Sequence, residues 1–278
     1  MKILRMLLGF VVFIVVLFAL SAGYLYFFQE RVVFAPAREI TMTPDEVGLT
    51  WEDLYLEVAP GVKVNAWYIS APDSAQKTVL FCSGNAGNIS RRIYTAQFLT
   101  ELGVNVMLVD YRGYGRSQGS PSEKNAYADI RAAYNWLISE KKVPAENLYL
   151  FGRSLGGAVA IDLASKAPVA GLIVESSFTS AAEVGRKMFP FMPVKMLSRY
   201  RFDSASKIGL VNCPVLITHS PDDGMIPFEM GRRLFELAPE PKEFIELAGA
   251  HNERDYYESE KYVNGLRRFL GLDQSSPS

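Results

Sequence analysis

The chain has 278 residues, of which 49% are hydrophobic and 21% are charged, a balance typical of a globular protein with one sizeable core. The net charge of −1 gives no sign of an electrostatic partner, so nucleic acid is not expected to bind. Two cysteines, Cys82 and Cys213, are too few for a disulfide framework and are expected to be buried free thiols.

Residues 6–28 form an apolar run of 23 residues without a charge, long enough at about 1.5 Å per residue to cross a hydrocarbon layer of roughly 30 Å. Lys2 and Arg5 precede the run, and its far end carries Tyr24, Tyr26, Phe27 and Phe28, where an interfacial belt is expected. We therefore expect residues 1–29 to be a membrane anchor, with the N-terminus cytoplasmic and the rest exported. The small residues at 19–22 leave a cleaved signal peptide as the alternative.

A short linker with two prolines, residues 29–44, follows the anchor. Two strand-like segments come next, at residues 54–58 and 62–69. They alternate in places between apolar and polar residues, and Ala59-Pro60-Gly61 joins them. This pattern predicts a hairpin at the edge of a sheet.

From residue 77 onward, short apolar segments alternate with amphipathic ones. Strands are expected at residues 78–82, 104–110, 147–151, 171–175, 214–218 and 243–247. Helices are expected at residues 89–102, 122–141, 155–166, 228–237 and 253–270. This alternation predicts an α/β fold with a mostly parallel central sheet flanked by helices on both faces. Functional sites in such sheets gather at the carboxyl ends of the strands.

The segment Phe151-Gly152-Arg153-Ser154-Leu155-Gly156-Gly157 lies between one of these strands and the next helix. Gly-x-Ser-x-Gly in that context is the nucleophile-elbow pattern, in which a tight turn exposes a serine hydroxyl and leaves no room for side chains at Gly152 and Gly156. A helix that starts directly after the serine aims free N–H groups at the same place. Ser154 is therefore the candidate nucleophile, and the alternative is a glycine-rich turn with an idle serine.

A serine nucleophile needs a base, and the chain has only two histidines. His251 follows the last expected strand through Ala248-Gly249-Ala250, so a loop can bring its imidazole to the elbow. His219 closes a strand and is expected to be a structural histidine bonded to its own loop. The acid that orients the base is Asp222 or Asp223, between which residue types alone do not decide. Either choice gives the chain order Ser…Asp…His, the order known for the α/β-hydrolase arrangement.

An oxyanion intermediate needs N–H donors. The first expected donor is the amide of Leu155, directly after the nucleophile. The second is expected in the loop Ser83-Gly84-Asn85-Ala86-Gly87-Asn88, at the amide of Asn85. For the segment at residues 110–117, Asp-Tyr-Arg-Gly-Tyr-Gly-Arg-Ser, a structural role is favoured over a place at the mouth of the site.

The combination of SGNAGN, DYRGYGRSQG, FGRSLGG, HSPDDGMIP and AGAHNE resembles the α/β-hydrolase superfamily over residues 30–271. More narrowly, it is similar to membrane-anchored serine hydrolases related to serine aminopeptidases and depalmitoylases. The family segment His-Gly-x-x-Asp-x-x-Val/Ile-Pro then implies that Asp223 is the acid, beside Ser154 as nucleophile and His251 as base. The chain departs from the family at Ser83, where His is usual, and at Ser220, where Gly is usual.

The resemblance implies a hydrolase domain at residues 30–271 with a short cap at 176–212, followed by a frayed tail at 272–278. Apolar side chains of the cap are expected to hold an acyl chain or to pack the cap onto the core. We expect a serine hydrolase of a carboxylic ester or thioester, such as a lipid or an acyl-protein. The alternatives are a serine peptidase related to the aminopeptidases and a catalytically silent, membrane-anchored binding protein.

No Walker loop, GxGxxG or metal-ligand spacing occurs in the sequence, so no cofactor and no metal are expected. The expected partners are an ester substrate and the membrane, and the sequence indicates no oligomeric state. In a bacterium the domain would face the periplasm. In a eukaryote it would be lumenal, where a glycan on the sequon Asn88-Ile89-Ser90 would crowd the oxyanion loop, so the bacterial placement is favoured.

Overall fold

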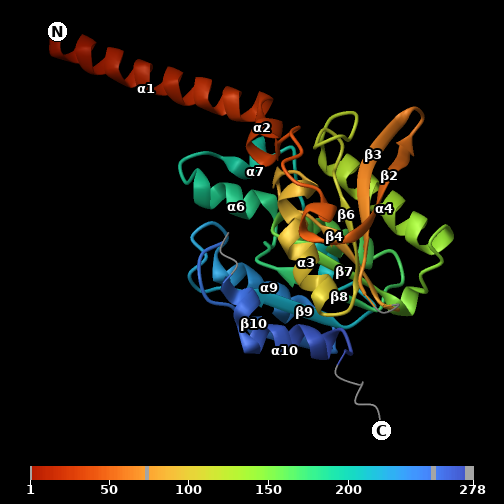
Figure 1. Cartoon of the computed structure of the whole chain (residues 1–278). Helices are drawn as coiled ribbons and strands as arrows, with labels where there is room; N and C mark the ends of the chain where they lie inside the picture. The colour runs from red at the N-terminus through yellow and green to blue at the C-terminus, as the bar shows by residue number, and fades with distance from the viewer. Residues whose placement is uncertain (1, 73–74, 252–254, 273–278) are drawn as a thin grey trace.

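The computed structural model describes residues 2–72, 75–251 and 255–272 (Figure 1). Its centre is an eight-stranded sheet of order β10-β9-β8-β7-β4-β6-β3-β2. Among these strands the pairs β2–β3 and β3–β6 are antiparallel, and the other neighbouring pairs are parallel. The strands are β2 Thr50–Ala59, β3 Val62–Ser70, β4 Thr78–Cys82, β6 Asn105–Val109, β7 Leu148–Arg153, β8 Gly171–Glu175, β9 Val215–His219 and β10 Lys242–Glu246. The mostly parallel sheet is confirmed, and the predicted hairpin is its antiparallel edge.

Helices cover both faces of this sheet. Side chains of α3 and α10 pack on one face, and those of α4, α5 and α9 pack on the other. The long helices of the domain are α3 Ile93–Glu101, α4 Glu123–Ser139, α5 Leu155–Ala164, α9 Phe228–Leu237 and α10 Glu260–Phe269. Each central strand is buried throughout and sends alternate side chains to the two cores; Leu80 and Phe81 of β4 illustrate this. Cys82 and Cys213 are buried free thiols, as expected.

Two predicted helices are interrupted in the structure. The one expected at 89–102 begins as the 3₁₀ helix η2 Ile89–Arg92, because the side chain of Asn88 accepts the N–H of Ser90 and tightens the first turn. The one expected at 253–270 is split into η4 Asp255–Glu258 and α10, since Ser259 between them is extended. Its first two residues, 253 and 254, lie outside the described residues. A further short 3₁₀ helix, η3 Ala145–Asn147, precedes β7.

The linker predicted at residues 29–44 has regular structure of its own. It contains α2 Gln29–Val33 and the two-residue strand β1 Ala35–Pro36, and η1 Pro44–Val47 begins at its end. β1 pairs in parallel with β5 Ala86–Gly87, which belongs to the loop after β4. Phe34 anchors the segment, with only 2% of its surface exposed. The chain that follows the N-terminal helix is therefore part of the domain.

The N-terminal helix α1 Lys2–Phe27 extends away from the domain (Figure 1). None of its residues is buried, and its mean hydropathy is 2.9 over an 18-residue window. Among the described residues it is the one helix long and apolar enough to cross a membrane. A membrane anchor and a signal sequence both have this length and this apolar composition.

The cap, residues 176–212, carries three short helices between β8 and β9: α6 Ala181–Met188, α7 Val194–Leu197 and α8 Ala205–Ile208. Several of its apolar side chains do not pack onto the core. Phe191 is 90% exposed and Met196 is 85% exposed. For these two residues, the alternative that they pack the cap onto the core is wrong. The tail predicted at 272–278 lies, apart from Leu272, outside the described residues.

Candidate active site

Ser154 stands on a sharp turn between β7 and α5. Its φ of 54° and ψ of −120° are strained for a residue with a side chain. A Cβ atom on Gly152 would lie 2.3 Å from the carbonyl oxygen of Gly156, and one on Gly156 would lie 1.9 Å from that of Cys82. The need for glycine on both sides of the serine is therefore confirmed, and the turn leaves Ser154 half-buried at the carboxyl end of β7.

Ser154, His251 and Asp223 come together at this turn. His251 Nε2 lies 3.1 Å from Oγ of Ser154, and His251 Nδ1 lies 2.6 Å from Oδ2 of Asp223. Because a carboxylate only accepts hydrogen bonds, Nδ1 carries the proton and Nε2 is left to accept from the serine hydroxyl. The structure thus places the three predicted side chains in bonding order. Their catalytic roles stay a prediction.

Asp223 is the aspartate that faces His251, whereas the side chain of Asp222 is exposed. Oδ1 of Asp223 accepts two backbone N–H groups of its own turn, at 2.8 and 2.9 Å. Burial by itself would raise the pKa of this carboxyl, but hydrogen bonds from His219, from His251 and from the backbone N–H of Ile226 outweigh burial and lower the pKa below its ordinary value. Asp223 therefore remains ionised at neutral pH.

The second histidine, His219, is fully buried at the end of β9. Its Nε2 donates to the carbonyl oxygen of Ile226 at 3.0 Å and lies 3.4 Å from Oδ2 of Asp223. A Cβ atom on Gly231 of α9 would lie 2.4 Å from Nδ1 of this ring, so the helix packs directly on it. The expected bond to its own loop is confirmed. The ring also lies beside Oδ2 of Asp223, the same carboxylate oxygen that His251 contacts.

The loop after β4, residues 83–88, lies against the nucleophile turn. A Cβ atom on Gly84 would be 3.6 Å from Cβ of Ser154. Leu155 is the first residue of α5, where backbone N–H groups have no acceptor within the helix. The two predicted oxyanion donors, the amides of Asn85 and Leu155, therefore belong to segments that adjoin Ser154. Their action as donors stays a prediction.

Three donors hold this loop in position. The hydroxyl of Tyr111 donates to the carbonyl of Ser83 at 2.9 Å, and the hydroxyl of Tyr114 donates to the carbonyl of Asn85 at 2.6 Å. The backbone N–H of Ala35 in β1 donates to the same Asn85 carbonyl at 3.0 Å. The structural role favoured for residues 110–117 thus includes support of the loop beside Ser154.

Known proteins are similar to this chain in sequence and in fold. The profile of the family "Serine aminopeptidase, S33" matches residues 73–206, which include Ser154 and end before Asp223 and His251. An uncharacterised protein of Mycobacterium tuberculosis is 36% identical over 244 residues, 87% of each chain. The α/β-hydrolase domain-containing protein WAV2 of Arabidopsis thaliana is 32% identical over 222 residues, 72% of each chain. The chain belongs to the α/β-hydrolase superfamily.

A solved structure shares the fold. The esterase Pf2001 of Pyrococcus furiosus superimposes on this hydrolase with a TM-score of 0.71 and 19% identity, covering 86% of the hydrolase and 98% of the esterase. At that identity the likeness concerns the fold, and the predicted α/β-hydrolase fold is confirmed. Membership of the superfamily also confirms the coarser functional prediction that the protein is a hydrolase.

The hydrolase has a buried ionic network beneath the site that no sequence motif identified. Arg153 Nε lies 3.3 Å from the carboxylate of Glu175, and Arg153 Nη2 donates to the backbone carbonyl of His251 at 3.0 Å. The hydroxyls of Tyr256 and Tyr262 also donate to Glu175. Burial would lower the pKa of Arg153, but Glu175 raises it above its ordinary value. The charged pair therefore ties the nucleophile turn to the loop that carries His251.

A signal for this network is present in the sequence of the hydrolase. Arg153 and Glu175 each end an apolar strand with a charge, and the two residues are in register on the adjacent parallel strands β7 and β8. Opposite charges at paired strand ends can meet, since parallel neighbours end at the same edge of a sheet. The sequence does not, however, determine that β7 and β8 pair with these two residues opposite each other.

Replacing His219 with leucine is expected to lower kcat of the hydrolase about tenfold with KM unchanged. The Nε2–H group that donates to Ile226 also lies 3.4 Å from Oδ2 of Asp223, and a hydrogen bond to a charged group is worth about 1.5–3 kcal/mol, of which only part reaches the transition state. His219→Gln, whose amide can take the place of the Nε2–H donor, should restore most of kcat. Steady-state kinetics with a chromogenic ester measure both variants. A leucine variant that is folded and keeps full kcat would show that this ring does not support Asp223.

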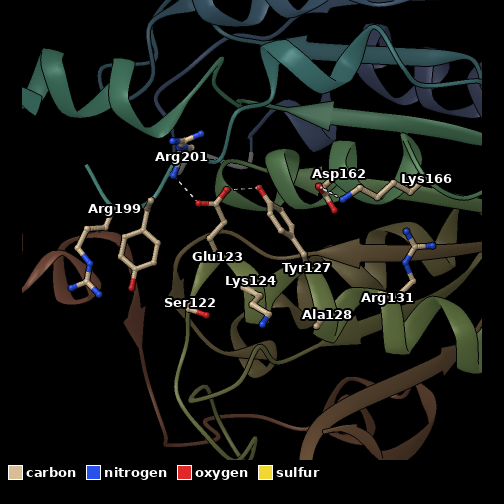
Figure 2. Close-up of a pocket in the computed structure, with 11 residues that line it drawn as sticks. Ser122, Glu123, Lys124, Tyr127, Ala128, Arg131, Asp162, Lys166, Arg199 and Arg201 are labelled. Atoms are coloured by element: carbon tan, nitrogen blue, oxygen red, sulfur yellow. Dashed lines mark hydrogen bonds and ion pairs between the residues drawn. The ribbon is translucent and has the colours of Figure 1, made fainter. Parts of the chain in front are cut away.

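A pocket of about 690 Å³ opens between α4, α5 and residues 199–201 of the cap (Figure 2). None of Ser154, Asp223 and His251 is among the residues that line it. In its wall, Glu123 accepts hydrogen bonds from the hydroxyl of Tyr127 at 2.9 Å and from the backbone N–H of Arg201 at 2.6 Å. This carboxylate therefore fastens Arg201 of the cap to α4, and the pocket is separate from the site at Ser154.

Proposed function

We propose that the hydrolase cleaves a carboxylic ester or thioester through an acyl-enzyme on Ser154. The observation that supports this most is the unbroken series of hydrogen bonds from Asp223 through His251 to the hydroxyl of Ser154 at the strained turn. Such a series activates a serine that is otherwise a poor nucleophile at neutral pH.

In the first half of the proposed reaction, Oγ of Ser154 attacks the substrate carbonyl and His251 Nε2 takes the hydroxyl proton. Asp223 stabilises the imidazolium that forms. The amides of Leu155 and Asn85 donate to the oxyanion of the tetrahedral intermediate, near the positive end of the α5 dipole. When the bond to the leaving oxygen or sulfur breaks, His251 returns the proton to that atom, and the acyl group stays on Ser154.

The second half releases the acid. His251 removes a proton from a water molecule, whose oxygen attacks the acyl carbonyl. The bond between that carbonyl and Oγ of Ser154 then breaks. His251 returns the proton to Oγ, and a carboxylic acid leaves. The same groups thus serve both steps, with the enzyme restored.

A peptidase related to the aminopeptidases is the second candidate, because the matching family profile carries that description. Rates with p-nitrophenyl esters and with aminoacyl anilides distinguish the two candidates.

We also propose that α1 is an uncleaved anchor, with the hydrolase domain on the exported side of the membrane. The helix continues without a break through residues 19–22, the plausible cleavage point, and Lys2 and Arg5 lie at the end assigned to the cytoplasm. In a bacterium the domain would then face the periplasm. The sequon at Asn88 has little bearing on this choice, since that side chain is buried and donates to the carbonyls of Ala37 and Glu39.

A fluorophosphonate probe tests the proposed function. We expect the folded full-length chain to take up one probe molecule, and peptide mapping to place the adduct on Ser154. The same preparation should hydrolyse p-nitrophenyl esters or acyl thioesters faster than aminoacyl anilides. A preference for anilides would favour the peptidase. A folded chain inert to the probe and to all of these substrates would instead support a catalytically silent binding protein.

A further inference from the structure

The tip of the cap, residues 188–196, exposes large apolar side chains close together in the chain. Met188 is 57% exposed, Phe191 is 90% exposed and Met196 is 85% exposed. Single exposed apolar residues are ordinary, but a group of them on one projecting segment marks a surface that binds protein or membrane. Either a protein or a membrane could therefore cover the cap tip.

Contacts with the end of α1 and the start of α2 set the depth of the cap tip. The side chain of Gln29 accepts the backbone N–H of Arg199 at 2.8 Å and donates to the carbonyl of Leu197. The guanidinium of Arg199 lies 5.9 Å from the centroid of the Tyr26 ring, and Leu25 shares a small apolar pocket with Phe189 of the cap. Figure 1 shows α6 and α7 beside the end of α1 from which the domain begins.

These contacts lie at the aromatic end of the apolar run, where the headgroup layer is expected if α1 spans a bilayer. Just beyond Arg199, the cap is also fastened to the domain. Glu123 of α4 accepts the backbone N–H groups of Arg201 and Phe202, at 2.6 and 2.8 Å. The cap tip is therefore held at the depth of the membrane interface.

The charges around the cap tip favour lipid over a protein partner. Arg186, Lys187 and Lys195 are exposed and lie within a few residues of the apolar side chains. Basic residues beside exposed apolar ones are typical of segments that lie in the interface of membranes with anionic lipids, where each cation adds attraction to the surface. Among the described residues of the cap tip there is no carboxylate to oppose this.

We propose that the cap tip inserts into the interfacial layer of the bilayer that α1 crosses. Met188, Phe191 and Met196 enter the upper part of the acyl-chain region, and the three basic side chains contact anionic phospholipid headgroups. The proposal rests on the anchoring role proposed for α1. The cap begins beside the nucleophile, where the hydroxyl of Ser177 donates to the carbonyl of Ser154 at 2.8 Å. Esters that partition into the membrane therefore reach the site from the bilayer surface.

Depth-dependent fluorescence quenching tests this in the full-length chain. Phe191→Trp and, as a matched control, Tyr55→Trp on the edge strand β2 are reconstituted into vesicles of phosphatidylcholine with about 30% phosphatidylglycerol, with and without brominated acyl chains. Tyr55 is 49% exposed, so both changes affect accessible aromatic positions. After subtraction of the wild-type signal from its three tryptophans, we expect bromolipid to quench the tryptophan at 191 at least twofold more than the one at 55.

The headgroup contact has its own test. Replacing Arg186, Lys187 and Lys195 together with glutamine in the Phe191→Trp chain should reduce quenching to the level seen in vesicles of phosphatidylcholine alone. The same change at Lys261 of α10, which is exposed and far along the chain, should leave quenching as it was. Equal quenching in anionic and neutral vesicles would contradict the assignment of anionic headgroups.

Flotation of the vesicles separates failure of this proposal from failure of the anchor. A chain that does not float with the vesicles would contradict the anchoring role of α1. A chain that floats, with no more quenching at position 191 than at 55, would overturn the proposal for the cap tip alone. A blue-shifted emission that bromolipid leaves unquenched would place the tip against a second copy of the chain and would overturn it as well.

Discussion

Replacing Ser154 with alanine is expected to lower kcat for ester hydrolysis by about 10⁶-fold, because a triad acts as a unit and loss of its nucleophile removes the acyl-enzyme route altogether. The fold should survive, since the hydroxyl of Ser154 projects from a turn that its backbone and the neighbouring glycines maintain. Steady-state kinetics and labelling by a fluorophosphonate probe measure the loss. Thermal unfolding reports whether the variant is folded.

Ser165→Ala is the matched control, because Ser165 lies just past the other end of α5 and its hydroxyl donates to the carbonyl of Asp162. Its activity should stay within about twofold of the wild type. If a folded Ser154→Ala variant retained more than a hundredth of the wild-type rate, water or another side chain would be the nucleophile, and the proposed mechanism would be wrong.

Asp223→Asn should lower kcat/KM by about 10⁴-fold, because the change would favour the wrong tautomer of His251. Oδ1 of Asp223 accepts two backbone N–H groups, so the amide oxygen of asparagine must occupy that place. Its NH₂ group then faces His251 Nδ1, which becomes an acceptor, and the imidazole proton moves to Nε2. In that form Nε2 no longer accepts the proton of Ser154. Kinetics with a chromogenic ester at neutral pH measure this loss.

The neighbouring aspartate supplies the control for this change. Asp222→Asn makes the same replacement one residue earlier, on an exposed side chain, and should change kcat/KM by less than about threefold. An Asp222 variant as inactive as the Asp223 variant would show that the turn as a whole, and not the bond to His251, determines the activity.

The nucleophile turn could be predicted because its determinants are local. Gly152 and Gly156 are required by contacts within one strand, one helix and the adjacent end of β4, and those contacts recur wherever a strand turns this sharply into a helix. His251 could be predicted for a different reason, since only one other histidine competed for the role. In both cases few alternatives remained once the turn was recognised.

Other features depended on register and packing, which the sequence does not state. Asp222 and Asp223 are chemically alike, and only the path of the loop after β9 decides which of them turns inward. Arg153 and Glu175 meet because β7 and β8 pair with those two residues opposite each other. Ser259 divides the last predicted helix although the apolar pattern continues through it, because its backbone is extended at that point.

The pairing of β1 with β5 has a practical consequence for anyone who wishes to study the domain in water. The loop that carries Asn85 receives its hydrogen bond from Ala35, and Asn85 Nδ2 donates to the carbonyl of Val33. A truncation that removes the apolar N-terminal helix must therefore keep residue 30 and all residues after it. A fragment that begins a few residues later would lack the contacts of Val33 and Ala35 with this loop. Its low turnover would then be mistaken for a property of the enzyme itself.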